Sequence, residues 1–196
     1  MTLADKFTSS RLVFAPVFFI FYFLPQFFPS IGPALWTVPL LLILFAVSEF
    51  TDMLDGMIAR KRGEVGDFGR LFDPFADTVT QITYFLCFVV DGIFPAFLFL
   101  IVLYREFGIL FIRNLMLKRG IAQGARKSGK IKTILYISAL SLALIASSMI
   151  RIGVDEKICH WLLFAAKTVF ILSVVIAVVS FIDYLLIFLK NSEKKL

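Results

Sequence analysis

Long apolar runs separated by short polar turns organise this chain. No charged residue occurs between Arg11 and Glu49, and a proline-rich stretch from Pro25 to Pro33 divides that run into two arms. About 20 apolar residues in a helix cross the roughly 30 Å hydrocarbon core of a bilayer. The pattern predicts an all-α integral membrane protein, with an N-terminal interfacial helix over residues 2–10 followed by six transmembrane helices. The predicted spans are 11–24, 35–60, 69–90, 93–117, 132–150 and 160–189.

The composition fits a chain whose main solvent is lipid. The sequence is 60% hydrophobic, contains 24 Phe and has only 17% charged residues, and a soluble domain could not hide that much apolar surface from water. We expect a single membrane-embedded domain over residues 1–196, with an interfacial segment at 1–10, a six-helix bundle at 11–190 and a polar tail at 191–196.

Basic residues gather at one end of the predicted spans. That end holds Lys6, Arg11, Arg60, Lys61, Arg62, Arg70, Lys118, Arg119, Arg126, Lys127, Lys130, Lys132, Lys190, Lys194 and Lys195. The turns at the opposite end hold only Arg151 and Lys157. Because cytoplasmic loops are enriched in Lys and Arg, both termini are expected in the cytoplasm. The formal charge of +6 fits contact with anionic lipid rather than with nucleic acid in so apolar a chain.

Four aspartates interrupt the predicted spans near their cytoplasmic ends. Asp52 and Asp55 are three residues apart, and Asp73 and Asp77 are four apart, so each pair lies on one helix face. The short polar loop over residues 61–68 is expected to bring the two pairs together. Carboxylates are costly in a membrane unless they are paired, hydrated or bound to metal. Their oxygen atoms suit Mg²⁺ or Mn²⁺, which commonly bridge substrate phosphates.

Small residues follow the first aspartate pair. Gly56 and Ala59 leave a strip that a flat ligand or a neighbouring helix can approach, so helix packing stays open as their role. Arg60 carries a planar fork that suits a phosphate or a carboxylate. An alternative role for the aspartates is interhelical salt bridging with Arg60, Arg70 or Arg105.

These positions form a spaced motif, which reads Asp52-x-x-Asp55-Gly56-x-x-Ala59-Arg60, then eight residues, then Gly69-x-x-x-Asp73-x-x-x-Asp77. The motif resembles the signature of the CDP-alcohol phosphotransferase family at every fixed position. The resemblance implies that the four aspartates hold two divalent ions together with the CDP moiety, and that Asp77 is also the catalytic base. Further CDP-binding residues implied by the resemblance are Asp5, Thr8, Gly56, Ala59, Arg60, Gly66 and Gly69.

Other segments resemble one subgroup of this family, the bacterial phosphatidylglycerophosphate synthases. Residues 5–11 look like its N-terminal Asn-x-x-Thr-x-x-Arg motif, with Asp5 in place of the usual Asn. The pair Arg105-Glu106, then Arg113, then residues 129–133 are also similar. The resemblance implies a homodimer and an acceptor-phosphate pocket formed by Arg105, Arg113 and Lys130. A structural role for Arg105, paired near Glu106 or with Glu49, stays open.

The resemblance implies metal-dependent transfer of a phosphatidyl group from CDP-diacylglycerol to sn-glycerol 3-phosphate, at a bacterial inner-membrane site facing the cytoplasm. The products would be phosphatidylglycerophosphate and CMP. Inositol phosphate, serine and choline are alternative acceptors, although choline would favour aromatic residues over arginines.

A divalent-cation transporter is an alternative of another class. It would place its carboxylates near the bilayer midplane and in symmetry-related halves, whereas these four aspartates share one cytoplasmic edge.

Overall fold

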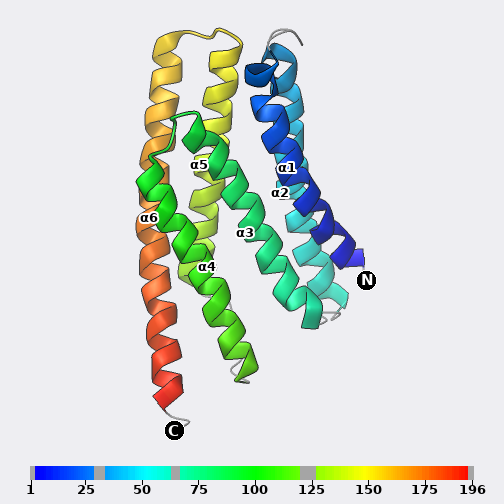
Figure 1. Ribbon diagram of the computed structural model, residues 1–196, viewed down its shortest axis with the longest axis vertical. Helices are drawn as coiled ribbons and strands as arrows, with labels where there is room; N and C mark the ends of the chain where they lie inside the picture. Colours follow the sequence, from blue (N-terminus) through cyan, green and yellow to red (C-terminus); the bar gives the residue numbers. More distant parts are fainter. Residues whose placement is uncertain (1–2, 29–33, 63–66, 120–126, 194–196) are drawn as a thin grey trace. The chain divides into compact units, whose positions relative to one another are not determined.

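The computed structural model describes residues 3–28, 34–62, 67–119 and 127–193 (Figure 1). For residues 3–9, 34, 52–62, 67–71, 127–128 and 191–193 it describes the backbone alone. The described chain is helical and contains no strand. Its elements are α1 (Leu3–Phe27), the short 3-10 helix η2 (Ala34–Trp36), α2 (Thr37–Arg62), α3 (Asp67–Val90), α4 (Ala96–Lys118), α5 (Lys127–Arg151) and α6 (Glu156–Glu193).

Three helices in the described part of the chain are long and apolar enough to cross a bilayer. The qualifying segments are Ser10–Phe27, Gly129–Arg151 and Glu156–Lys190, which belong to α1, α5 and α6. The chain is therefore an all-helical membrane protein, as predicted. Spans through α2, α3 and α4, and the side of the membrane on which the termini lie, stay predictions.

The first helix differs from its prediction. A separate interfacial helix was expected to end at residue 10, but α1 runs without a break from Leu3 to Phe27. Its polar residues Thr8, Ser9 and Ser10 are not helix breakers, and proline first occurs at Pro16. Polarity alone therefore did not mark a helix end at this point.

The helices form two compact units. Unit 1 contains Met1–Cys87 and Leu144–Cys159, and unit 2 contains Phe88–Ala143 and His160–Leu196. Unit 1 thus holds α1, α2 and most of α3 with the last turns of α5, and unit 2 holds α4 with most of α5 and α6.

Aromatic contacts hold the three helices of unit 1 together. Tyr84 of α3 is fully buried, and its ring lies 4.6 Å from the ring of Phe18 in α1 and 5.3 Å from that of Phe45 in α2, between centroids. Such tilted and edge-on arrangements suit the charge distribution of aromatic rings. Helices α1 and α2 also contact each other directly (Figure 1).

Arg151, at the end of α5, fastens the other end of unit 1. Its guanidinium donates hydrogen bonds to the hydroxyl of Thr37 (2.9 Å) and to the backbone carbonyl of Tyr22 (3.0 Å). It also lies 4.4 Å from the ring centroid of Tyr22, and the Tyr22 hydroxyl is 2.9 Å from that of Ser147. One of the two basic residues expected outside the cytoplasm therefore has a structural role.

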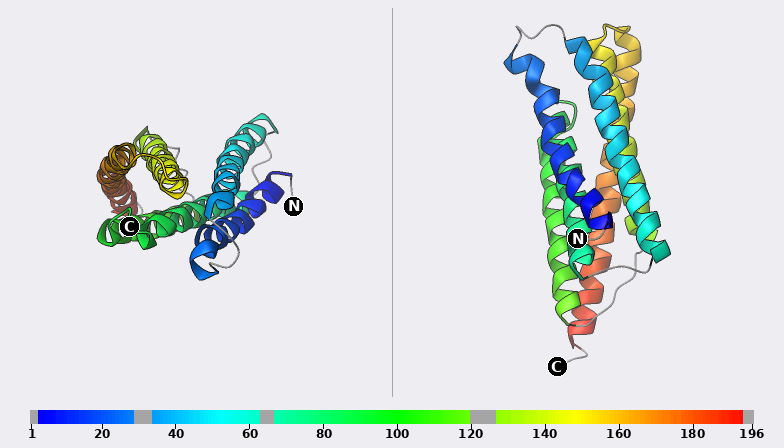
Figure 2. Two further views of the ribbon diagram at one scale, coloured as in Figure 1. Left: turned by 90° about the horizontal axis from the view of Figure 1, so that it is seen from above. Right: turned by 90° about the vertical axis from the view of Figure 1, so that its right-hand side faces the viewer.

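Small side chains line the buried face of α6 in unit 2. Ala166, Ser173, Ala177 and Ser180 are all buried, and together with the buried ring of Phe170 they recur at alternating steps of four and three residues. Small residues at this spacing let helix backbones approach closely within a membrane. Helices α5 and α6 run side by side in opposite directions (Figures 1 and 2).

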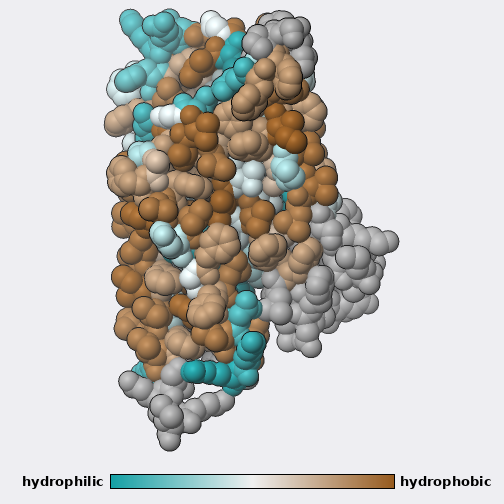
Figure 3. Space-filling view, viewed as in Figure 1, coloured by the Kyte–Doolittle hydropathy of each residue, from teal (hydrophilic) through white to brown (hydrophobic). Residues whose placement is uncertain are grey.

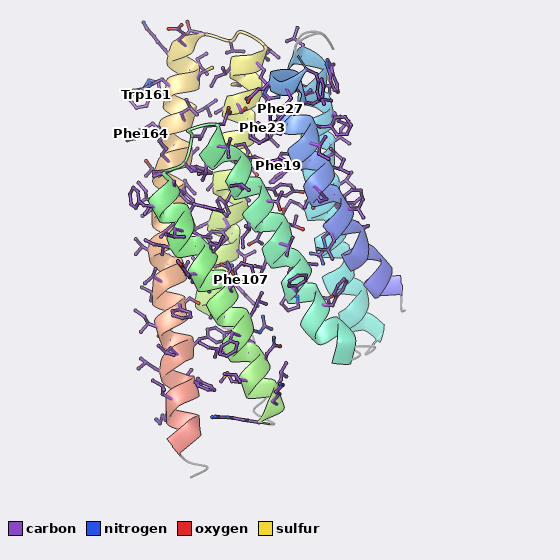
Figure 4. All side chains as sticks on the ribbon, in the orientation of Figure 1. Phe19, Phe23, Phe27, Phe107, Trp161 and Phe164 are labelled. Carbon is purple, nitrogen blue, oxygen red and sulfur yellow. The ribbon has the colours of Figure 1, made fainter. Side chains whose placement is uncertain are left out.

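The outer faces of unit 2 are apolar. Trp161 and Phe164 project outward from α6 and are largely exposed (Figure 4). Figure 3 shows apolar side chains along α4 and α6. Such surfaces fit contact with lipid acyl chains.

Candidate active site

Asp73 and Asp77 are the predicted site carboxylates whose side chains the structure describes. They lie one turn apart near the start of α3, and both are half-buried. A helix repeats every 3.6 residues, so a spacing of four residues places the two carboxylates on one face. This part of the prediction agrees with the observed helix.

Arg11 of α1 contacts Asp77 of α3. The guanidinium donates a hydrogen bond to the Asp77 carboxylate, forming an ion pair in which Arg11 is only 3% exposed. Seven residues further along each helix, Phe18 meets Tyr84. Two contacts with equal spacing on both helices show that α1 and α3 run parallel here, in a heptad-like register. The aromatic core thus sets the level at which Arg11 meets Asp77.

The same core relates α2 to the site. Phe45 of α2 meets Tyr84, and α2 and α3 run in opposite directions (Figure 1). Position 52 comes seven residues after Phe45, and Asp77 comes seven residues before Tyr84. Each step is about 10.5 Å along a helix axis. The backbone at position 52 therefore lies near the level of Asp77.

Most of the other predicted site side chains lie outside the described part of the structure. They are Asp5, Thr8, Asp52, Asp55, Gly56, Ala59, Arg60, Gly66 and Gly69. Within the described side chains, no group of three or more His, Cys, Asp or Glu could hold a metal ion. Asp73 and Asp77 supply two half-buried carboxylates, and carboxylate oxygens are a donor type that fits Mg²⁺ or Mn²⁺.

The predicted acceptor residues differ in their surroundings within unit 2. Arg105 is buried, and its Nη1 donates to both carboxylate oxygens of Glu106, at 2.8 and 2.9 Å. Its Nε donates to the backbone carbonyl of Ala177, and its Nη2 to the hydroxyl of Ser180, both at 3.2 Å. The pairing of Arg105 near Glu106, one of the two roles considered for it, is therefore observed.

Arg113 and Lys130 have exposed side chains, unlike Arg105. Of Lys130 and Lys132, the two α5 lysines whose side chains are described, Lys132 points inward, and its Nζ donates to the Glu106 carboxylate at 3.0 Å. Two residues along a helix turn the side chain by about 200°, which explains why Lys130 and Lys132 face opposite ways.

Sequence reasoning placed Arg11, Glu106 and Lys132 in segments similar to the subgroup, but it named none of them among the site residues. One signal was available for Glu106, because an acidic residue inside an apolar helix requires a partner. The choice between Lys130 and Lys132 depended on which face of α5 turns inward. The sequence does not indicate that face, because basic residues recur throughout residues 126–132.

Comparison with known proteins identifies the family. The family model described as CDP-alcohol phosphatidyltransferase matches residues 1–179. This chain belongs to the CDP-alcohol phosphatidyltransferase family. It is accordingly an enzyme of this class, a transferase of phospholipid biosynthesis, and the alternative of a cation transporter is not supported.

Relatives of this phosphatidyltransferase occur in several bacteria. The chain is 37% identical over 192 residues to the CDP-diacylglycerol–glycerol-3-phosphate 3-phosphatidyltransferase of Treponema pallidum, covering 94% of this chain and 88% of that protein. A Bacillus subtilis protein of the same name is 30% identical, covering 73% and 76%. One from Rickettsia typhi is 26% identical, covering 82% and 87%.

Proposed function

We propose that this enzyme transfers the phosphatidyl group of CDP-diacylglycerol to sn-glycerol 3-phosphate, releasing phosphatidylglycerophosphate and CMP. The observation that carries the proposal is the similarity, over 94% of the chain, to a relative named for that donor and acceptor. The two aspartates on one face of α3 support a site that handles the diphosphate. Inositol phosphate, serine and choline are the competing acceptors.

Asp52, Asp55, Asp73 and Asp77 are proposed to hold two divalent ions, Mg²⁺ or Mn²⁺. The register set by Phe45 and Tyr84 supports this, because it brings the backbone at position 52 to the level of Asp77. Bound ions would neutralise charge on the diphosphate of the donor and on the departing CMP. The CDP moiety is proposed to contact Asp5, Thr8, Gly56, Ala59, Arg60, Gly66 and Gly69.

Asp77 is proposed as the general base. Its carboxylate accepts the proton of the acceptor's hydroxyl group. The hydroxyl oxygen then forms a bond to the phosphorus that carries the diacylglycerol, and the bond from that phosphorus to CMP breaks. Arg11 supports this role, because its contact with Asp77 orients the carboxylate and is held in place by the aromatic core.

Arg105, Arg113 and Lys130 are proposed to bind the phosphate of the acceptor. Exposed Arg113 and Lys130 can reach a water-soluble substrate. The guanidinium of Arg105 makes four described contacts, and the two to Glu106 start from one nitrogen and can share an N–H group, so donor capacity is left for the acceptor. Charge-assisted bonds of this kind favour a phosphorylated acceptor over a neutral alcohol.

The wider setting of the enzyme is part of the proposal. We infer one catalytic domain with six spans, both termini and the active site on the cytoplasmic side of a bacterial inner membrane, and a homodimer. The collection of Lys and Arg at one end of the predicted helices supports the orientation.

A panel of acceptors tests the proposal. The purified enzyme in detergent receives CDP-diacylglycerol, Mg²⁺ and one acceptor at a time, and both CMP release and the lipid product are measured. Glycerol 3-phosphate should support turnover, whereas serine, choline and inositol phosphate should not. Turnover with one of those three alone would refute the proposed acceptor while leaving the family assignment intact.

A further inference from the structure

One lysine interrupts the apolar outer surface of α6 in unit 2. Lys167 is exposed, and so are the apolar side chains of Phe164 and Ile171, one turn before and one turn after it. A charged side chain that faces lipid is costly unless its head reaches water or a counter-ion. The Lys167 ammonium therefore requires a partner beyond the apolar surface that surrounds it.

The protein supplies no counter-ion for Lys167 within the described part of the chain, where this side chain makes no hydrogen bond or ion pair. Helix α5, which runs beside α6, contains no Asp or Glu. Glu106 of α4 is buried and already paired, and Asp91, in the turn before α4, has a contact of its own. Asp183 is on α6 itself, about 24 Å from Lys167 along the helix axis.

The length of α6 places Lys167 at one boundary of the hydrocarbon core. The helix has 38 residues, which is about 57 Å at 1.5 Å per residue and longer than the roughly 30 Å core. The stretch from Lys167 to Lys190 measures about 35 Å on the same scale, and the one charged residue between them is the half-buried Asp183. A core bounded by these two lysines fits α6, so Lys167 lies at the level where acyl chains meet headgroups.

Two aromatic side chains lie beside Lys167 on the side of the helix N-terminus. Trp161 and Phe164 are 70% and 59% exposed, their ring centroids are 6.2 Å apart, and both project outward from α6 (Figure 4). Helical side chains lean toward the N-terminus of their helix, so the Lys167 ammonium extends toward these rings. Because Trp is enriched at membrane interfaces, the cation and the two rings lie together at headgroup level.

We propose that Lys167, Trp161 and Phe164 form a binding site for an anionic phospholipid. The lipid phosphate pairs with the Lys167 ammonium, and the two rings pack against the acyl chains next to the glycerol backbone. Phosphatidylglycerol is favoured over phosphatidylcholine, because the phosphate of phosphatidylcholine already has a cation in its own headgroup. The site takes no part in phosphatidyl transfer, so this inference does not depend on the acceptor.

Trp161 itself reports on the bound lipid. The chain contains two Trp, and Trp36→Phe, which keeps an aromatic ring beside Phe21, leaves Trp161 alone. Bromine atoms on acyl chains quench Trp fluorescence only at close range. The full-length Trp36→Phe enzyme is placed in phosphatidylcholine vesicles, in which a small fraction of the lipid is replaced by brominated phosphatidylglycerol or, in a parallel sample, by brominated phosphatidylcholine.

Brominated phosphatidylglycerol should be enriched about fivefold at Trp161 over brominated phosphatidylcholine, because one basic residue near a membrane surface contributes about that factor. In the same background, Lys167→Met should remove the enrichment and Lys167→Arg should keep it. Lys157→Met is the matched control, since it removes an exposed lysine from the first turn of the same helix, and it should leave the enrichment unchanged. Each variant is checked for wild-type elution in detergent.

Equal quenching by the two brominated lipids in the Trp36→Phe enzyme would overturn the proposal, and this comparison needs no variant of Lys167. Enrichment that persists in Lys167→Met, or that Lys157→Met abolishes to the same extent, would reveal attraction to the general surface charge and would also overturn the site. The measurement uses no acceptor and no turnover. Failure of the lipid site and failure of the proposed reaction are therefore separate results.

Discussion

Replacing Arg11 by methionine would remove the cation that contacts Asp77 and keep much of the apolar volume of the side chain. Arg11 is 3% exposed and sits one heptad from Phe18 in the aromatic core, so its position does not depend on Asp77 alone. The variant should fold, because the ring contacts of Tyr84 with Phe18 and Phe45 remain.

The size of the effect follows from the ion pair. A hydrogen bond to a charged group contributes about 1.5–3 kcal/mol. The Asp77 side chain is 38% exposed, so solvent screens the pair and the lower end of that range applies. If the free energy that holds the Asp77 carboxylate in its orientation falls by about 1.5 kcal/mol, kcat falls roughly tenfold. Arg11→Lys keeps the charge but loses the planar fork of the guanidinium. Its kcat should therefore lie between those of the wild type and Arg11→Met.

The assay is CMP release at saturating CDP-diacylglycerol and glycerol 3-phosphate over a series of Mg²⁺ concentrations. Arg11→Met should lower kcat, while the Mg²⁺ concentration for half-maximal rate should fall, because a cation competing for Asp77 has been removed. Arg151→Met is the matched control, since it removes a guanidinium at the other end of unit 1 and should lower thermal stability with little change in kcat. A folded Arg11→Met enzyme with wild-type kcat would refute the positioning of Asp77 by Arg11.

Three further results are expected. EDTA should abolish turnover and added Mg²⁺ or Mn²⁺ should restore it, because carboxylates hold the proposed ions; full activity in metal-free enzyme, measured as CMP release, would contradict the metal site. Asp77→Asn should lower kcat by about 10²- to 10⁴-fold, the usual contribution of a general base, and a proportional loss of CDP-diacylglycerol binding would make Asp77 only a ligand. Arg113→Ala should raise the KM for glycerol 3-phosphate by about tenfold through loss of a charge-assisted bond, and an unchanged KM would remove Arg113 from the acceptor pocket.

The helices could be predicted from the sequence because a membrane demands long apolar runs. The charge-free stretch after Arg11 and the proline-rich turn after Pro25 led directly to α1 and α2. The break expected after residue 10 is absent, because the polar residues at 8–10 do not interrupt the helix. For α2, α3 and α4, their helical state is confirmed and their insertion is still a prediction.

The common face of Asp73 and Asp77 could also be predicted, since helical periodicity alone places residues four apart on one face. The partner of Asp77 could not be predicted. Arg11 lies on a different helix, and its contact depends on the register between α1 and α3 that Phe18 and Tyr84 establish. Aromatic residues are abundant in this chain, with 24 Phe, so the pair that sets the register cannot be picked out from the sequence.

Arg105 illustrates why a buried arginine in a membrane helix has two valid interpretations. Adjacent residues on a helix point about 100° apart, so Arg105 and Glu106 are not expected to face each other. The long arginine side chain nevertheless reaches both oxygens of Glu106. That contact alone would make Arg105 a structural residue. Lys132 of α5 donates to the same carboxylate, and Arg105 also donates to Ala177 and Ser180 of α6, so the contacts join three helices. The structural role of Arg105 is therefore observed, and its proposed role in binding the acceptor's phosphate is tested by the KM for the acceptor rather than by stability.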